Sequence, residues 1–157
     1  LLKKDGQKVR FYIIGDGRYR EELEKIIQEK DVSDMFRLLG RKKPEEIPAY
    51  MAHFDVAFLS FADNELFQMT IPAKLQSYMA CGMPILAVAD GETRRIIEEA
   101  ECGKCIKIGD IEKLTATIIE ITQAEKVDCD RMSLCAQEYA GQFFNKELLI
   151  DQIQEYI

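Results

Sequence analysis

The chain has 157 residues, of which 47% are hydrophobic and 31% charged, and its formal net charge at pH 7 is −7. Residues 1–157 are enough for one domain with a full hydrophobic core, and we expect a single domain. The acidic balance argues against nucleic acid as a partner, although one small phosphorylated ligand needs only local positive potential. No apolar run approaches the roughly 20 residues of a membrane span.

The chain opens on Leu1 rather than Met, with "LLKKDGQK", which is typical of a helix end running into a strand. We therefore expect a piece of a longer protein. Five cysteines without the spacing of a disulfide scaffold indicate reduced thiols and a cytoplasmic protein. Cys102 and Cys105 form "CGKC", but a second pair of zinc ligands at similar spacing is missing, so we expect no metal in this domain.

Apolar runs alternate with stripes of apolar residues at helical spacing along the chain. The runs predict strands that are buried on both faces, and the stripes predict amphipathic helices. In chain order we expect a strand at 9–15, a helix at 18–30, a strand at 35–40, a helix at 43–54, a strand at 55–61, a helix at 73–81, a strand at 84–89, a helix at 92–100, a strand at 104–109, and helices at 111–121, 130–140 and 146–157.

This alternation predicts an α/β fold, namely a doubly wound, mostly parallel Rossmann-like sheet with helices on both faces. Ligands of such sheets bind beyond the carboxyl ends of the strands, at the topological switch point. We therefore expect residues 15–17, 40–43, 60–71 and 89–92 to surround one crevice.

Gly15 and Gly17 follow the first predicted strand in "IIGDGRYREELEK". A dinucleotide fingerprint needs a third glycine, and its position holds Arg20, so we expect no nicotinamide site. The two glycines serve equally as a tight turn or as room for the close approach of another ligand.

Three basic residues follow the second predicted strand in "LGRKKPEE". For Lys42 and Lys43 we favour a solvated basic turn, because most charge runs lie on solvent faces. Arg41 is nearest to the strand and is the better candidate for the crevice.

The segment "TIPAKLQSYMACGMPILA" places a helix start directly after an apolar strand. Pro72 lacks an N–H and suits the first helical turn. The free N–H groups of that turn and the helix dipole attract an anion, and Lys74 adds a full positive charge. A lysine on an exposed helix face is an equally good explanation, so the residues indicate a phosphate-binding crevice without naming a reaction.

The motifs together resemble the C-terminal domain of family-4 glycosyltransferases of the GT-B fold, of the type linked to bacterial surface-polysaccharide synthesis. The resemblance runs from about Val9 to Thr122 and rests on "GDGRYREELEK", "FRLLGRKKPEEIPAYMAHFDVAFLSF", "IPAKLQSYMACGMPILA" and "GETRRIIEEAECGKCIKIGD".

The resemblance implies a domain that holds a nucleoside-diphosphate sugar, such as a UDP-sugar, for a retaining transfer to a glycan or lipid-linked acceptor. The donor is a substrate, and no separate cofactor is implied. The implied partner is an N-terminal acceptor domain of the same chain, absent here, and we expect these residues alone to be inactive. In the full-length protein we expect a cytoplasmic location, at most at the inner face of the membrane, with any membrane association through the missing part.

By the resemblance, the donor-binding residues are Gly15, Gly17, Arg41, Ile71, Pro72, Ala73, Lys74 and Ser77, and the catalytic candidates are Lys74 and Glu65. Family members carry paired glutamates where this chain has Met69 and Ser77. Ser77 offers the donor ribose a weaker hydroxyl contact, Met69 cannot hydrogen-bond the sugar well, and Glu65 is the candidate replacement. The loss of the pair keeps two alternatives open, a non-catalytic nucleotide-binding module and a GT-B sugar-nucleotide epimerase domain.

Family domains of this type also begin with a strand and a helix ahead of residue 9. In the usual strand order this first strand lies between the strands predicted here at 9–14 and 56–59. Without this strand, the backbone N–H and C=O groups along the facing edges of these two strands lack hydrogen-bond partners, and buried backbone groups need such partners. We expect direct pairing of these two strands, in preference to a segment or dimer contact supplied by another copy.

Overall fold

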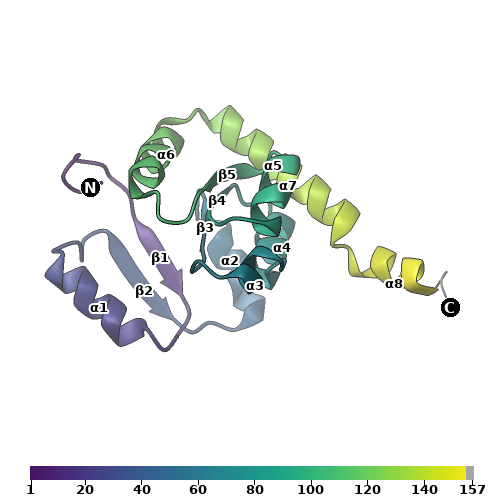
Figure 1. The fold of residues 1–157 in the computed structure, drawn as a ribbon, viewed down its shortest axis with the longest axis horizontal. Coiled ribbons are helices and arrows are strands. Elements are labelled where there is room, and N and C mark those ends of the chain that lie inside the picture. Colours follow the sequence, from purple (N-terminus) through teal and green to yellow (C-terminus); the bar gives the residue numbers. More distant parts are fainter. Residues whose placement is uncertain (155–157) are drawn as a thin grey trace. The chain divides into compact units, whose positions relative to one another are not determined.

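The structure is a computed structural model that describes residues 1–154 (Figure 1). The chain forms two compact units, Leu1–Tyr50 (unit 1) and the part from Met51 onward (unit 2), and each is described by itself. Both contain parallel strands connected through helices, which confirms the α/β class. The expectation of a single domain stays a prediction.

Unit 1 is built on two parallel strands, β1 (Phe11–Ile14) and β2 (Phe36–Gly40), connected by helix α1 (Arg20–Glu29). Phe11 lies opposite Phe36 in the register, and their stacked rings have centroids 5.0 Å apart. The apolar stripe of α1 buries Ile27. A 3-10 turn, η1 (Pro44–Glu46), leads into the short helix α2 (Ile47–Met51).

Unit 2 is built on a parallel sheet with the strand order β3-β4-β5, in which β4 is central. The strands are β3 (Ala57–Ser60), β4 (Ile85–Val88) and β5 (Gly103–Ile106). Helices α3 (Glu65–Gln68) and α4 (Ala73–Ala80) connect β3 to β4, and α5 (Glu92–Glu99) connects β4 to β5. The helices α6 (Ile111–Gln123), α7 (Lys126–Phe143) and α8 (Lys146–Gln154) follow.

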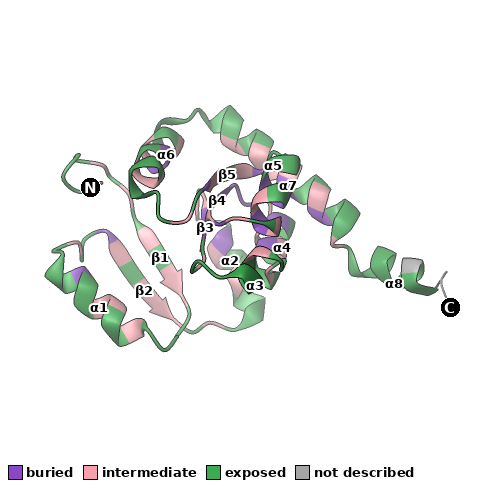
Figure 2. Ribbon diagram, viewed as in Figure 1, coloured by how far each residue is buried: buried purple, intermediate pink, exposed green. Residues whose placement is uncertain are grey.

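The core of unit 2 lies between its sheet and helices α4, α5 and α7. Leu75 and Met79 of α4 are fully buried, as is Ile97 of α5 (Figure 2). Ala136 and Ala140 of α7 are also buried, and their small side chains let α7 pack closely along α4 (Figure 1). This packing fixes α4 against the sheet.

The predicted strands and helices are confirmed, with two differences in helices. The expected helix at 43–54 is divided into η1 and α2, because Pro48 has no N–H to donate to the preceding turn. Helix α3 was not predicted; Asn64 caps it by accepting a hydrogen bond from the Leu66 N–H at 2.8 Å. The last three residues of the helix predicted at 146–157 lie outside the described residues.

The expected pairing of the strands at 9–14 and 56–59 is wrong. Within residues 1–154, β1 pairs with β2 in one sheet, and β3 pairs with β4 in another. The apolar pattern identifies each strand, but strand neighbours depend on long-range packing that the pattern does not contain. Completion of the sheet by another copy stays a prediction.

The cysteines are free thiols, and burial raises the pKa of the Cys102 thiol to about 11. Within residues 1–154, no helix is both long and apolar enough to cross a membrane.

The close approach of β4 and β5 requires a glycine at position 103. A Cβ there would lie 1.9 Å from the Ile85 carbonyl oxygen, a backbone atom that cannot swing away. We predict that Gly103→Ala forces the two strands apart and lowers the free energy of unfolding by about 1–3 kcal/mol or more, measured by urea denaturation.

Gly141→Ala is the matched control for this substitution. A Cβ at Gly141, in α7, meets no atom within 4 Å, so the change is expected to be neutral or to stabilise by about 0.5–1 kcal/mol. Equal unfolding midpoints for the two variants would contradict the prediction.

Candidate functional site

Helix α4 begins with an open, positively polarised end. Pro72 is its N-cap, with extended backbone angles (φ −73°, ψ 140°) and no side-chain cap. The Leu75 N–H donates to the Pro72 carbonyl at 3.0 Å, whereas the N–H groups of Ala73 and Lys74 precede the first helical acceptor. The first turn contains no acidic residue, and Ile71 and Ala73 are exposed. These features favour an anion at this end.

Lys74 is available to such an anion. Its side chain is exposed, and none of the ion pairs among the described residues involves it. One turn along, the Ser77 hydroxyl donates to the Ala73 carbonyl at 2.9 Å, which leaves the lone pairs of its oxygen open to a donor. At about 1.5 Å of rise per residue, Ser77 lies roughly 4.5 Å along the helix axis from Lys74.

The segment between β3 and α4 lies against the turn after β4. Gly91 at that turn has φ 68° and ψ −140°, and a Cβ there would lie 2.0 Å from the Gln68 carbonyl oxygen. The rings of Phe61 and Phe67, with centroids 6.0 Å apart, also hold the segment. Glu65, the first residue of α3, is exposed on it. The structure thus brings together two of the four segments predicted to line the crevice.

The other two predicted segments meet in unit 1. The Gly15 N–H donates to the Gly40 carbonyl at 2.9 Å, so the loops after β1 and β2 adjoin. Arg41 is exposed, and no hydrogen bond or ion pair within residues 1–154 uses its side chain. By contrast, the Lys42 ammonium lies over the Tyr50 ring, 5.4 Å from its centroid, which agrees with a structural role for Lys42.

Arg20 lies beside these two loops. The sequence analysis considered it only as the residue that stands where a dinucleotide fingerprint needs its third glycine. A Cβ at Gly40 would lie 3.7 Å from the Arg20 guanidinium. Asp16 and Glu24 pair with Arg20 at 3.7 and 2.9 Å and hold it there. Its helical spacing from Asp16 and Glu24 is the signal in the sequence that identifies this cluster.

Arg94 was also missed, and its role is structural. Its guanidinium donates to two carbonyls, of Ala89 at 3.1 Å and Cys105 at 3.2 Å. It also contacts the carboxylates of Asp90 and Glu98. Arg94 therefore ties α5 to the carboxyl ends of β4 and β5, the same edge of the sheet at which α4 begins.

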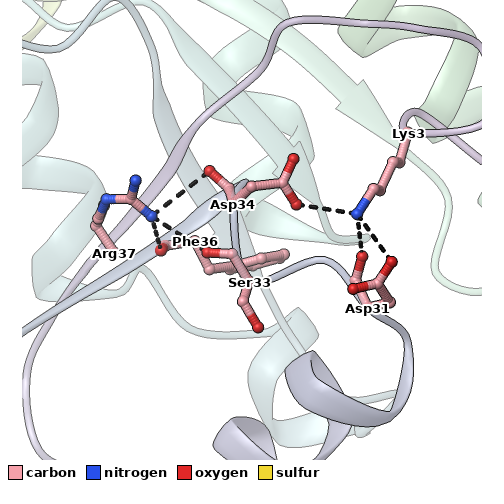
Figure 3. Close-up of polar contacts among 6 residues, drawn as sticks. All are labelled: Lys3, Asp31, Ser33, Asp34, Phe36 and Arg37. Atoms are coloured by element: carbon pink, nitrogen blue, oxygen red, sulfur yellow. Dashed lines mark hydrogen bonds and ion pairs between the residues drawn. The ribbon is translucent and has the colours of Figure 1, made fainter.

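A dense polar cluster of unit 1 lies at the amino end of β2 (Figure 3). The Lys3 ammonium contacts the Asp31 carboxylate at 3.2 Å and the Asp34 carboxylate at 3.1 Å, and also the Asp31 carbonyl. Arg37 donates to the carbonyls of Ser33 and Phe36. These contacts hold the turn before β2, at the end of a parallel strand where ligands do not usually bind.

The parallel sheets and crossover helices define an α/β protein, and in unit 2 the candidate site lies at the carboxyl edge of the strands. A family model described as "Glycosyl transferases group 1" matches residues 1–138, and the chain belongs to this family.

The curated relatives are longer than this chain. It is 28% identical over 160 residues to the amylovoran biosynthesis glycosyltransferase AmsK of Erwinia amylovora, with 100% of this chain and 39% of AmsK covered. It is 24% identical to the colanic acid biosynthesis glycosyltransferase WcaL (named putative) of Salmonella typhimurium, covering 97% of this chain and 38% of WcaL. The chain thus spans about two fifths of the length of these relatives.

Solved structures share the fold. Anabaena Alr3699/HepE in complex with UDP matches with a TM-score of 0.73 and 23% identity, over 94% of this chain and 40% of HepE. S. aureus TarM, crystallised with UDP, matches with a TM-score of 0.78 and 17% identity, over 98% of this chain and 30% of TarM. At these identities the likeness supports the fold alone.

The Lys3 cluster predicts a pH dependence. The hydrogen bond from Lys3 lowers the pKa of the Asp34 carboxyl below its usual range, so this pair stabilises the fold above the unfolded pKa of Asp34 and is lost as the pH falls through the folded one. We predict that Lys3→Ala raises the pKa of Asp34, measured by NMR titration of its carboxyl carbon. The control Lys4→Ala, which removes the neighbouring exposed lysine, should leave that pKa unchanged; an effect of equal size would assign the shift to net charge.

Proposed function

We propose that the chain is the donor-binding domain of a retaining glycosyltransferase, which transfers a sugar from a nucleoside-diphosphate sugar to a glycan or lipid-linked acceptor within a longer protein. The observation that carries the proposal is the uncapped start of α4 with an unpaired lysine in its first turn. Family membership and relatives named for exopolysaccharide biosynthesis support it. So does the presence of UDP in two neighbouring structures.

In this proposal the first turn of α4 binds the diphosphate of the donor. The N–H groups of Ala73 and Lys74 and the helix dipole face the phosphate oxygens, and the Lys74 ammonium supplies the full charge. When the bond between sugar and diphosphate breaks, negative charge grows on the leaving phosphate. N–H groups and an ammonium that are already oriented toward the phosphate stabilise this charge more in the transition state than in the bound substrate. This difference accelerates transfer.

Ser77 and Glu65 take the sugar-directed roles in the proposed site. The Ser77 oxygen, whose proton is already donated to Ala73, accepts a hydrogen bond from a ribose hydroxyl. The exposed carboxylate of Glu65 lies on the segment held against Gly91 and is the candidate for a hydroxyl of the donor sugar. Gly15, Gly17 and Arg41 of unit 1 remain predicted donor-binding residues.

A second candidate function is retained because Met69 and Ser77 replace the family's paired glutamates. A module that only binds the nucleotide, or an epimerase acting on sugar nucleotides, uses the same diphosphate contacts without passing the sugar to an acceptor. These alternatives share the α4 site and differ in the fate of the sugar.

The diphosphate site predicts the effect of removing one charge. We predict that the chain binds UDP and that Lys74→Ala weakens this binding about 10- to 100-fold, because charge-assisted hydrogen bonds contribute about 1.5–3 kcal/mol. Isothermal titration calorimetry with UDP, GDP and ADP measures the affinities and identifies the base.

The matched control is Lys42→Ala, which removes a lysine engaged with Tyr50. It should change UDP affinity less than about twofold, because the proposed diphosphate contacts do not include Lys42. Similar losses of UDP affinity in both variants would show a general charge effect. Lys74 would then be a lysine on an exposed helix face with no specific role in binding.

Transfer itself is a property of the longer protein. We predict that the intact parent protein releases nucleotide from a UDP- or GDP-sugar only when a glycan or lipid-linked acceptor is present, and that the product keeps the anomeric configuration of the donor. Conversion of the donor to its epimer without acceptor and without net release of nucleotide would identify the epimerase, and binding that leaves the donor unchanged would identify the non-catalytic module. Proton NMR of the product distinguishes the three.

A further inference from the structure

The segment between β3 and α4, residues 61–72, is mostly exposed to solvent. Only Phe61, Gln68 and Pro72 in it are half-buried, and the other residues are exposed. Within the described part of the chain, every hydrogen bond of residues 62–71 stays inside the segment. Packing contacts therefore have to hold the segment in place, and the half-buried Gln68 is where they act.

Gln68 is anchored by a backbone contact that requires glycine at position 91. A Cβ at Gly91 would lie 2.0 Å from the carbonyl oxygen of Gln68, 2.6 Å from its carbonyl carbon and 2.7 Å from its Cα. These are backbone atoms, so a larger residue at position 91 displaces the segment itself and not merely a side chain. The backbone angles of Gly91, φ 68° and ψ −140°, are also accessible essentially to glycine alone.

Gly91 is itself held by helix α5. It is the N-cap of α5, and its carbonyl accepts a hydrogen bond from the Arg95 N–H at 3.0 Å. Helix α5 in turn buries Ile96 and Ile97. The contact between Gly91 and Gln68 therefore connects an exposed segment to the core of unit 2.

The contact determines the position of Glu65 through the one-turn helix α3. Glu65 and Gln68 are the first and last residues of α3, and the Asn64 side chain caps it. Because a capped turn moves as a unit, fixing Gln68 also fixes Glu65.

The start of α4 does not depend on this contact. Leu75 and Met79 are fully buried and hold α4 in the core, whatever the position of α3. The N–H groups of Ala73 and Lys74 therefore keep their places when α3 moves.

We infer that Gly91 is a positioning residue, which acts through Gln68 to place Glu65 for the donor sugar. The inference rests on the proposed function for the role of Glu65. Without the contact, α3 occupies several positions, and the affinity for the sugar falls in proportion to the fraction of molecules in which Glu65 is correctly placed. The proposed diphosphate contacts on α4 remain.

The test compares two ligands by isothermal titration calorimetry. One is UDP, and the other is whichever of UDP-glucose, UDP-galactose and UDP-N-acetylglucosamine binds the unaltered chain most tightly. The ratio of the UDP-sugar affinity to the UDP affinity reports the contact with the sugar. We expect Gly91→Ala to lower this ratio about tenfold, which corresponds to correct placement of Glu65 in about a tenth of the molecules.

Gly103→Ala is the matched control. A Cβ at Gly103 also meets a backbone carbonyl oxygen, at 1.9 Å, but at the amino end of the strands. This variant should lower the free energy of unfolding and leave the affinity ratio within about twofold, because distant sites act independently.

A double-mutant cycle separates positioning from a general loss of structure. Glu65→Ala should lower the ratio by itself. The double variant Gly91→Ala/Glu65→Ala should differ from Glu65→Ala by less than about twofold, because Gly91 acts only through Glu65. Circular dichroism verifies that each variant is folded. If Gly91→Ala is unfolded, Asn64→Ala takes its place in the cycle, since it loosens α3 at an exposed position and should show the same non-additivity.

An unchanged ratio in Gly91→Ala or in Glu65→Ala overturns the inference. So do losses that add in the double variant, or an equal loss in Gly103→Ala. In each of these cases UDP still binds, and the diphosphate site proposed at α4 stands. Absence of UDP binding to the unaltered chain overturns the proposed function, and the inference with it.

Discussion

Parallel pairing of β3, β4 and β5 is the constraint on which the rest of unit 2 depends. Parallel strands need crossover connections, and each crossover here begins at the carboxyl edge of the sheet. Helices α4 and α5 therefore both begin at this edge, with their unpaired N–H groups. Three tight contacts preserve the arrangement: Gly103 against Ile85 between strands, Gly91 against Gln68 between loops, and Arg94 on the strand-end carbonyls. The binding properties proposed for α4 follow from this backbone geometry and need few side chains.

Much of this fold was predictable because its signals are local. Apolar runs identify β1 to β5, and Pro72 identifies the start of α4. Helix α3 was missed because its four residues are about one turn, too short for apolar periodicity to register. The two-sheet arrangement was missed for another reason: Phe58 and Ala57 indicate a strand with one exposed and one buried face, but not which strand lies beside it. Strand order depends on long-range packing.

In the candidate site, too, the sequence predicts the local features and not those that depend on long-range packing. The sequence predicts a helix that begins at residue 73, because Pro72 and Lys74 lie next to one another in the chain, after an apolar strand. The partners of Arg94 are backbone carbonyls at the ends of two strands, and backbone carbonyls leave no trace in the amino-acid pattern.

The family resemblance implies paired glutamates where this chain has Met69 and Ser77, and such a replacement would change the electrostatics of α4 as well as its hydrogen bonding. With Ser77 in place of an acid, Lys74 is the single charged residue between Ala73 and Ala80. A neutral hydroxyl contributes about 0.5–1.5 kcal/mol in a hydrogen bond, against about 1.5–3 kcal/mol for a charged group, so the proposed ribose contact is weaker. A carboxylate one turn from the diphosphate would also repel it, and this chain lacks that repulsion. In the proposed site, therefore, selectivity moves away from the ribose and toward the diphosphate at the start of α4.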